Sequence, residues 1–353
     1  MKVSLVDAGD RVLADKDFEV AEGRLDRAEL ASAIHGIDAP DAIGHRVVHG
    51  GPRYRHSVRL DQEVVDYLKT ISDLAPLHLP AALAGIEAAR DLLPQVPAVA
   101  CLDTAFHAGM PAAASTYAIP KAWRERGIER YGFHGFSHAY ASRRAAEMLQ
   151  RPAGELRIVT CHLGSGASLA AVMGGTSVDT TMGFTPLEGL VMATRSGTVD
   201  PGMLLWLQRH ARVGEPELTE ALDRRGGLQA LAGTGDMREV LKRMSSDDDA
   251  KLAFDVYIHR LRASIAAMAA AMNGLDALVF TGGVGEKAAP VREAAAGGLG
   301  FLGVEIDPKL NEGVAGDADI SAAAARVRTL VIKAREDVEV AREVRRVLTE
   351  DPA

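Results

Sequence analysis

Hydrophobic positions along the chain fall into short apolar runs that alternate with longer, Ala-rich amphipathic stretches. The short runs predict β-strands and the longer stretches predict helices. The predicted strands cover residues 2–6, 12–20, 42–48, 98–102, 156–161, 167–172, 277–280 and 329–333. The predicted helices cover residues 25–34, 83–93, 254–272 and 338–348. This alternation indicates an α/β protein, and the recurrence of a strand followed by a Gly-rich or charged loop in both halves favours two duplicated domains.

Length and charge narrow the picture further. A chain of 353 residues exceeds one ordinary core, which indicates two domains of roughly 150–200 residues each. The net charge is −8, and the 40 Lys and Arg residues are scattered along the chain. This distribution argues against a nucleic-acid partner, so an anionic ligand must be held by local arginines and glycines.

Cysteine content and the most apolar helix bear on the cellular compartment. Cys101 and Cys161 lie in apolar, strand-like runs and are too few for a disulfide framework, so we expect buried, reduced thiols in the cytoplasm. No basic-then-apolar signal opens the chain. The apolar run at residues 263–272 is about half of what a bilayer requires. It predicts a core or subunit-interface helix, and we expect no membrane partner.

Two Gly-rich segments directly follow predicted strands. One contains Gly164 and Gly166, and the other contains Gly282, Gly283 and Gly285. Glycine allows backbone N–H groups to approach a phosphate without a Cβ in the way. The alternative is that both segments are ordinary turns.

Two arginines and two acids lie in positions suited to anion chemistry. Arg46 precedes a His-Gly-Gly segment and Arg195 lies within Thr-Arg-Ser-Gly; a guanidinium can bind carboxylate or phosphoryl oxygens with two parallel hydrogen bonds. Asp103 and Glu336 follow predicted strands, where ligand sites of α/β proteins lie. Surface ion pairs for the arginines, and an N-cap role for Asp103, are the alternatives.

Four histidines lie in Gly-flanked or turn-like contexts, namely His78, His134, His138 and His162. An imidazole could donate a hydrogen bond to a transferring phosphoryl group, although a structural role is the alternative for each one. Spacings of the His-x-x-His or Cys-x-x-Cys kind, which would indicate a transition-metal site, are absent from the sequence.

A series of motifs resembles the acetate kinase (acetokinase) family from about residue 42 to the end of the chain. They are HRVVHGG (45–51), APLHLPAALAGI (75–86), LDTAFHAGMP (102–111), YGFHGFSH (131–138), CHLGSGASLA (161–170), TMGFTPLEGLVMATRSG (181–197), TGDMREV (234–240) and NGLDALVFTGGVGE (273–286). The resemblance implies a two-domain, actin-like α/β fold (acetate and sugar kinase/Hsp70/actin) with an interdomain cleft. Residues 1–107 would form the N-terminal domain, joined by the helix at 338–353, and residues 108–337 would form the nucleotide-binding and dimerisation domain.

The resemblance also implies a role for individual residues. Catalytic positions fall on Asp103, His134 and Arg195. Substrate positions fall on Arg46 and on an apolar pocket of Val48, Leu77, Phe133 and Pro186. Nucleotide-binding positions fall on Lys2, His162, Leu163, Gly164, Ser165, Gly166, Asp236, Met237, Arg238, Gly283, Val284, Gly285, Glu286 and Lys287. A metal position falls on Glu336.

The activity implied is reversible phosphoryl transfer between ATP and acetate, giving ADP and acetyl phosphate. It would depend on Mg²⁺, with Mn²⁺ as an alternative, in a cytoplasmic homodimer. Propionate kinase is the nearest alternative, because one methylene in an apolar pocket changes discrimination by only about 1–3 kcal/mol. A nucleotide-binding protein without catalysis is a second alternative, motivated by the N-terminus.

Three positions depart from the family pattern. Lys287 and Arg335 stand where the family more often has Asn. The third departure is larger, because the family opens with a strand and an Asn-Ala-Gly-Ser-Ser-Ser-Leu-Lys phosphate loop, whereas this chain offers Asp7-Ala8-Gly9-Asp10. We expect Lys2 to match the closing lysine, residues 3–6 to be the family's second strand, and the first strand to be missing, with altered pairing beside residues 3–6. In the alternative alignment, residues 4–7 are the first strand and Asp7-Ala8-Gly9 is an altered phosphate loop.

Overall fold

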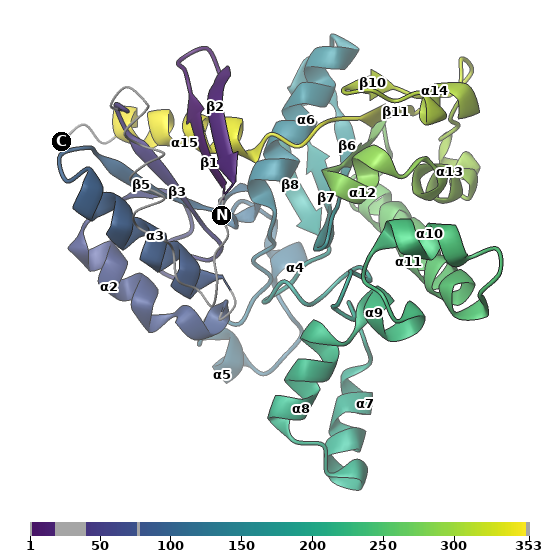
Figure 1. Cartoon of the computed structure of the whole chain (residues 1–353), viewed down its shortest axis with the longest axis horizontal. Helices are drawn as coiled ribbons and strands as arrows, with labels where there is room; N and C mark the ends of the chain where they lie inside the picture. Colours follow the sequence, from purple (N-terminus) through teal and green to yellow (C-terminus); the bar gives the residue numbers. More distant parts are fainter. Residues whose placement is uncertain (1, 18–39, 76–77, 351–353) are drawn as a thin grey trace. The chain divides into compact units, whose positions relative to one another are not determined.

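A computed structural model describes residues 2–17, 40–75 and 78–350. The chain divides into two compact units (Figure 1). Unit 1 comprises Met1–Ala108 and Arg335–Ala353, and unit 2 comprises Gly109–Ala334. The helix predicted at residues 25–34 and the candidate pocket residue Leu77 lie outside the described residues.

Among its described residues, unit 1 combines short strands with three longer helices. Its elements are β1 (Lys2–Val6), β2 (Val12–Asp17), β3 (Ile43–Val47), β4 (Val58–Arg59), α2 (Gln62–Thr70), η1 (Ser72–Leu74), α3 (Leu79–Leu92), β5 (Ala98–Leu102), η2 (Ala105–His107) and α15 (Glu336–Glu350). Strands β1 and β2 form an antiparallel two-stranded sheet, as the sequence predicts, with a turn at residues 7–10. A separate three-stranded sheet has the order β3-β5-β4, in which β3 and β5 are parallel.

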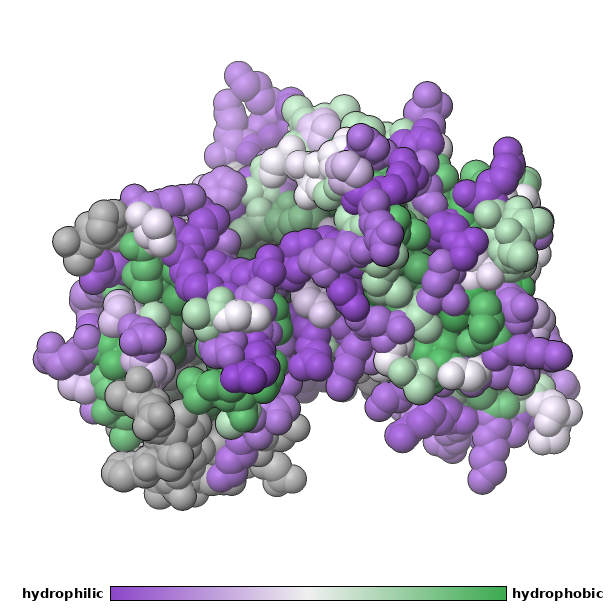
Figure 2. Space-filling model, turned by 90° about the horizontal axis from the view of Figure 1, so that it is seen from above, coloured by the Kyte–Doolittle hydropathy of each residue, from purple (hydrophilic) through white to green (hydrophobic). Residues whose placement is uncertain are grey.

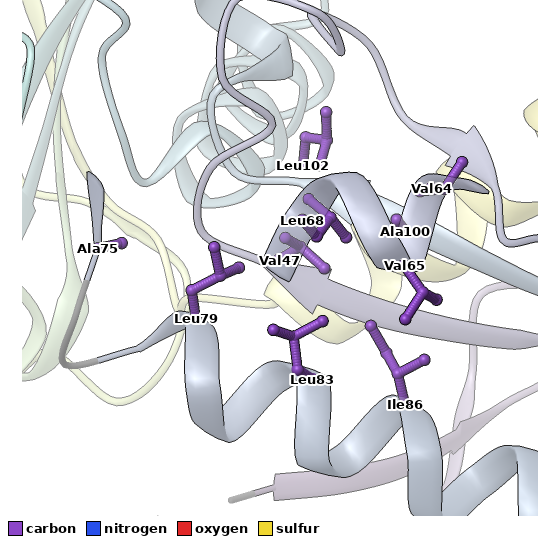
Figure 3. Packing of buried hydrophobic residues seen from close by; sticks show 10 residues of the cluster. All are labelled: Val47, Val64, Val65, Leu68, Ala75, Leu79, Leu83, Ile86, Ala100 and Leu102. Atoms are coloured by element: carbon purple, nitrogen blue, oxygen red, sulfur yellow. The ribbon is translucent and has the colours of Figure 1, made fainter. Parts of the chain in front are cut away.

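The core of unit 1 lies between the three-stranded sheet and helices α2 and α3. Figure 3 shows apolar side chains of both helices gathered around Val47 of β3. Helix α2 begins where Asp61 accepts a hydrogen bond from the Val64 N–H at 2.8 Å, the usual role of an N-cap aspartate. Its apolar positions Val64, Val65 and Leu68 then recur with helical spacing and are buried.

Unit 2 is larger and is built on one sheet. Its strands are β6 (Arg157–Leu163), β7 (Ala167–Met173), β8 (Thr176–Thr180), β9 (Ala277–Thr281), β10 (Ala318–Asp319) and β11 (Arg328–Val331). Its helices are α4 (Ala112–Ser115), α5 (Lys121–Arg124), α6 (Gly135–Leu149), α7 (Pro201–Trp206), α8 (Glu215–Thr219), α9 (Gly227–Ala232), α10 (Met237–Arg243), α11 (Asp248–Ala271), α12 (Gly282–Lys287), α13 (Ala289–Gly297) and α14 (Pro308–Glu312). Shorter elements are the 3₁₀ turns η3 (Ala153–Glu155) and η6 (Gly300–Leu302) and the π-helical η4 (Leu207–Ala211) and η5 (Glu220–Arg224).

The sheet of unit 2 has the strand order β10-β11-β9-β6-β7-β8. Strands β11, β9 and β6 are parallel, whereas β7, β8 and β10 are added antiparallel. Helices α6 and α11 cover opposite faces. Thr160 of β6 bonds to His138 of α6. Burial raises the pKa of the Tyr257 phenol of α11, and the next strand residue, Cys161, lies near enough to that phenol to help raise it. Successive strand residues point to opposite faces, so the sheet is enclosed between the two helices.

Several predicted boundaries are wrong; helix α11, for example, begins at Asp248 rather than at residue 254. His162 and Leu163, predicted as loop, are the last residues of β6 and pair with Ser168 and Ala167, because the buried side of the strand continues to Leu163. The Gly-rich segment after β9, also predicted as loop, forms the short helix α12. Helix α3 begins at Leu79 rather than at residue 83, because Pro80 lies in its first turn, where no backbone N–H is needed.

The surface is mixed. Figure 2 shows hydrophilic side chains over most of the visible face, with hydrophobic ones gathered in smaller areas between them, which is ordinary for a globular protein. Over the described residues, no helix is long and apolar enough to cross a membrane.

Candidate active site

In unit 1, Arg46 lies between two carboxylates. Its Nη2 is 2.9 Å from Oδ2 of Asp103, and its Nη1 is 3.0 Å from Oε2 of Glu336. Arg46 lies near the end of β3 and Asp103 follows β5, so their closeness results from the parallel pairing of these strands. Glu336 is the first residue of α15. Three predicted site residues, spread over the length of the chain, therefore meet in one group.

The electrostatics of this group follow from the ion pairs and from burial. The charge of Asp103 above all, with a contribution from Glu336, raises the pKa of Arg46, so the guanidinium remains charged. Burial raises the pKa of Glu336 above its ordinary value, although Arg46 acts in the opposite direction. The group has a fixed cation flanked by two hard oxygen donors.

Two other predicted residues of unit 1 have structural contacts of their own. Val48 is partly buried and packs against the core of Figure 3. Lys2 forms ion pairs with Asp337 of α15 at 3.1 Å and with Asp15 of β2 at 3.4 Å.

In unit 2, His134 begins a chain of hydrogen bonds. His134 Nδ1 is 2.9 Å from Ser168 Oγ, which is 2.8 Å from His138 Nε2. His138 Nδ1 is 2.7 Å from Thr160 Oγ1. His134 itself has left-handed backbone angles, with φ of 56°, at the N-terminus of α6. This strained position and the side-chain contacts fix the direction of its imidazole.

His162 and Gly166 complete this arrangement. The rings of His134 and His162 stack with centroids 4.3 Å apart, and His162 Nδ1 is 2.7 Å from Ser137 Oγ. A Cβ added to Gly166 would lie 3.3 Å from His134 Nε2 and 3.6 Å from Arg195 Nη1. Thus His134 and Arg195 both lie against the glycine turn that follows β6.

Arg195 is held by side-chain and backbone contacts. Its Nε bonds to Asp223 Oδ1 at 3.0 Å, and its Nη1 donates to the Pro186 carbonyl at 3.4 Å. Phe133, directly before His134, is almost fully buried. The predicted residues Phe133, His134, Pro186 and Arg195 therefore belong to adjoining segments of unit 2.

The two Gly-rich segments start next to each other, at the carboxyl ends of the parallel strands β6 and β9, because His162 of β6 pairs in register with Thr281 of β9. Gly282 has φ of +79°, and a Cβ there would lie 2.8 Å from the Leu163 carbonyl oxygen, so glycine is required. Glu286 Oε1 accepts hydrogen bonds from the N–H groups of Gly282 and Ala334 at 3.0 and 2.9 Å. Glu286 thereby fixes the fold of the second segment.

Asp236 and Arg238 face each other on the surface. Asp236 caps α10, and its carboxylate pairs with the Arg238 guanidinium at 2.6 Å. Hydrogen bonds from Arg238 lower the pKa of Asp236. Across the residues that the structure describes, no group of three or more His, Cys, Asp or Glu side chains forms a metal cage.

Comparisons with known proteins identify the family of the chain. A sequence model of the acetokinase family matches residues 19–342. The chain belongs to the acetokinase family. The acetate kinase of Gloeobacter violaceus is 55% identical over 306 residues, which is 86% of this chain and 76% of that protein. The acetate kinase of a Synechococcus strain is 54% identical over 301 residues, or 85% and 74% of the two chains.

Solved acetokinase structures resemble this one as well. The Porphyromonas gingivalis acetate kinase is 36% identical with a TM-score of 0.85, over 98% of this chain and 89% of the other. A propionate kinase from Francisella tularensis is 39% identical with a TM-score of 0.82, over 87% and 79%. The predicted family, its phosphotransferase class and its actin-like fold are therefore confirmed.

Some residues of the arrangement escaped the sequence analysis. Ser168 and Asp223, which hold His134 and Arg195, were not singled out. Ser168 lies inside an apolar strand, where a buried hydroxyl needs a hydrogen-bond partner. That was the available signal. Asp223 lies in a π-helical stretch whose charged residues resemble an ordinary surface.

Proposed function

We propose that the protein is an acetate kinase that catalyses the reversible transfer of a phosphoryl group between ATP and acetate. The observation that carries the proposal is the pair of arginine sites: Arg46 flanked by Asp103 and Glu336, and Arg195 beside His134 and the Gly166 turn. Phosphoryl transfer asks little covalent chemistry of the protein and much positioning and charge stabilisation. Guanidinium and imidazole donors around a glycine turn are suited to that task.

Each group has a role in this proposal. Arg46 binds the carboxylate or phosphoryl end of the substrate, and Asp103 holds Arg46 in place. His134 and Arg195 donate to the phosphoryl oxygens as charge spreads over them in the transition state. The substrate carboxylate is already ionised at neutral pH, so no general base is required.

The nucleotide is assigned to the glycine segments and their flanks. Residues 162–166, 236–238 and 283–287, together with Lys2, would bind ATP or ADP. Backbone N–H groups at such turns can approach phosphate oxygens closely. The present contacts of Lys2 with Asp15 and Asp337 would have to be exchanged for phosphate contacts.

The donor set suits a magnesium ion. Mg²⁺ in phosphoryl-transfer enzymes is held by one or two carboxylates together with phosphate oxygens and water. Glu336, with Asp103 beside the same guanidinium, offers such oxygens, and Mn²⁺ has the same ligand preference. When bound, the ion would neutralise charge on the phosphate groups.

Substrate size is assigned to Val48, Phe133 and Pro186, with Leu77. We expect acetate to be preferred over propionate, and both over butyrate, because Phe133 and Pro186 are bulky. Val48→Ala should shift the preference toward propionate by enlarging the pocket. An unchanged acetate-to-propionate ratio in this variant would mean that the methyl group binds elsewhere.

The central experiment measures acyl phosphate as its hydroxamate, with acetate, propionate and butyrate in parallel. Arg46→Ala and Arg195→Ala should each lower kcat by about 10²–10³-fold, since each removes a donor to the developing charge. Arg209→Ala is the matched control, because Arg209 is exposed on η4 and takes part in none of the contacts described for either group. Full activity in either site variant, or no acyl phosphate from any acid, would refute the proposal.

The assembly and the compartment are part of the same proposal. We infer a homodimer formed mainly by unit 2, in which exposed apolar side chains such as Leu205 and Trp206 on α7 would gain a covered position. A light-scattering mass near 37.4 kDa, that of one chain, would contradict it. Cys101 and Cys161 are free and buried, which fits a reducing cytoplasm.

A further inference from the structure

A partly buried network in unit 2 lies behind the segment that carries Pro186. Arg130 Nη1 donates to three successive carbonyls, those of Thr180, Thr181 and Met182, at 3.2, 3.2 and 3.0 Å. Its Nη2 donates to Glu188 Oε1 at 2.7 Å. One guanidinium therefore forms hydrogen bonds at both the start and the end of the segment 180–188.

Tyr117 forms hydrogen bonds with Phe184 and Glu188 of the same segment. Its hydroxyl donates to Glu188 Oε2 and accepts a hydrogen bond from the Phe184 N–H at 3.0 Å. Burial, followed by the bond to Glu188, raises the pKa of Tyr117, so the phenol stays protonated and can donate. The Arg130 guanidinium also lies over the Tyr117 ring, 5.4 Å from its centroid.

Gly183 shows how closely this network fits the segment. A Cβ added there would lie 1.8 Å from Glu188 Oε2 and 2.1 Å from the Tyr117 hydroxyl. The carboxylate and the phenol thus occupy the space that a side chain would take. The Gly183 carbonyl in turn accepts hydrogen bonds from the N–H groups of Tyr131 and Gly132 at 3.1 and 3.3 Å. These bonds join the segment to the residues that directly precede Phe133 and His134.

We propose that Arg130, Glu188 and Tyr117 form a positioning network that sets which carboxylic acid the site accepts. This rests on the proposed function, in which Phe133 and Pro186 line the acid pocket. Pro186 lies between two hydrogen-bonded residues of the segment, Phe184 and Glu188. Its carbonyl also accepts a hydrogen bond from Arg195. A displacement of about 1 Å at a reacting site can cost 10²-fold in rate, so loosening the network should be felt first in the fit of the acid.

The test compares kcat/KM for acetate, propionate and butyrate in Tyr117→Phe and Glu188→Ala. Tyr117→Phe keeps the ring and removes one hydroxyl. Glu188→Ala removes the acceptor of both the Tyr117 and the Arg130 hydrogen bonds. We expect the acetate-to-propionate ratio to fall about threefold in the first and about tenfold in the second, within the range that one methylene can discriminate. KM for ATP should stay unchanged.

Two further variants separate positioning from general stability. Glu188→Gln retains an acceptor for Tyr117 and Arg130 and should partly restore the ratio. Tyr257→Phe is the matched control, because it removes a buried phenol hydroxyl that has no hydrogen-bond partner among residues 2–17, 40–75 and 78–350; its ratio should equal that of the unsubstituted chain.

The outcomes are distinguishable. An active unsubstituted chain whose acid ratios stay the same in Tyr117→Phe and Glu188→Ala, with only the melting temperature lowered, would overturn the network assignment alone. Absence of acyl phosphate from all three acids in the unsubstituted chain would overturn the proposed function, and the network assignment with it.

Discussion

The strands of unit 2 form one continuous ladder, whereas those of unit 1 are divided between two sheets. In unit 2, β6 is paired on both edges, with β7 and with β9. In unit 1, and among the residues that the structure describes there, β1 pairs with β2 alone and β3 pairs with β5 alone. The two units therefore differ in how their strands are paired.

Helix α15 supplies what the ladder of unit 1 lacks, since it contacts both of the sheets there. Lys2 pairs with Asp337, and Asp10 in the β1–β2 turn pairs with Arg342 and Arg345. The Lys and Arg side chains of these pairs are exposed, whereas the two carboxylates are more buried. Surface ion pairs contribute about 0–1 kcal/mol each. The attachment of β1 and β2 is therefore weaker than the pairing around β6.

This difference concerns function as well as stability. Arg46 lies on β3, a strand of unit 1 with one edge unpaired in the described part of the chain. His134, His162 and Arg195 lie around the fully paired strands of unit 2. The substrate end of the proposed site thus depends on the less supported sheet, and we expect unit 1 to unfold first.

Core truncation should give the largest effect. Leu68 of α2 and Leu169 of β7 are both fully buried, and Leu→Ala at such positions costs about 2–5 kcal/mol. Calorimetry should show two transitions, with Leu68→Ala lowering the first and Leu169→Ala the second. A single transition that both variants lower equally would show that the units unfold together and would remove the contrast.

The motifs that resemble the acetokinase family predicted the family and the actin-like fold, whereas local patterns predicted the α/β class and most of its elements. The strand and glycine patterns of residues 42–51, 161–170 and 277–285 required no knowledge of distant contacts. The errors occurred where local and tertiary preferences differ: His162 and Leu163 extend a strand because a partner strand is available, and the glycines after β9 form helix α12.

The supporting contacts of the site could not be predicted in the same way. Arg130 and Glu188 lie 58 positions apart, and Arg46 and Asp103 lie 57 positions apart. Neither Arg130 nor Glu188 follows a spacing that indicates a partner. Their pairing depends on how the chain folds around Gly183, which only the three-dimensional structure contains.

Acid should weaken unit 1 through His45 on β3. Burial lowers the pKa of His45 from 6.5 to about 4. Unfolded His45 therefore gains its proton below pH 6.5, whereas folded His45 stays neutral down to about pH 4. Stability that is complete above pH 6.5 is lost as the pH falls toward 4, by at most about 3 kcal/mol.

The measurement is the midpoint of the first transition between pH 7 and 4, in the unsubstituted chain and in His45→Gln. The variant should lose this part of the acid dependence, because glutamine does not titrate. His56→Gln, at an exposed position of the same unit, is the matched control. Parallel pH profiles of the unsubstituted chain and His45→Gln would disprove the effect.

A strand supplied ahead of residue 2 should strengthen unit 1 by a smaller amount. Strands β1 and β3 each carry one edge without a ladder partner in the described chain, and each new hydrogen bond contributes about 0.5–1.5 kcal/mol before ordering costs. A fused segment with the Asn-Ala-Gly-Ser-Ser-Ser pattern, placed ahead of residue 2, should pair with these edges. The fusion should raise the free energy of unfolding in the first transition by roughly 2 kcal/mol. It should also increase kinase activity.

A fusion of the same length with proline at alternate positions is the control, since proline cannot donate to a ladder. The fusion with the Asn-Ala-Gly-Ser-Ser-Ser pattern should change the first transition and leave the second one unchanged. Equal stability and equal kinase activity in the fused and unfused chains would refute the pairing.

The smallest expected effect concerns Asp10, through which the β1–β2 turn is attached to α15. Asp10 Oδ2 accepts from Arg342 Nε at 2.6 Å, and the carboxylate also pairs with Arg345. Asp10 has φ of 65°, a left-handed conformation that asparagine also tolerates, so Asp10→Asn removes the charge without adding backbone strain. This substitution should lower the free energy of unfolding in the first transition by about 0.5–1 kcal/mol. A double-mutant cycle with Arg345→Gln should give a coupling of similar size that disappears in 1 M salt, whereas Asp41→Asn, at an exposed position of unit 1, should change nothing. If the coupling is zero at low salt, the two sheets of unit 1 are held together by backbone contacts after all, and the contrast with unit 2 is one of strand order rather than of strength.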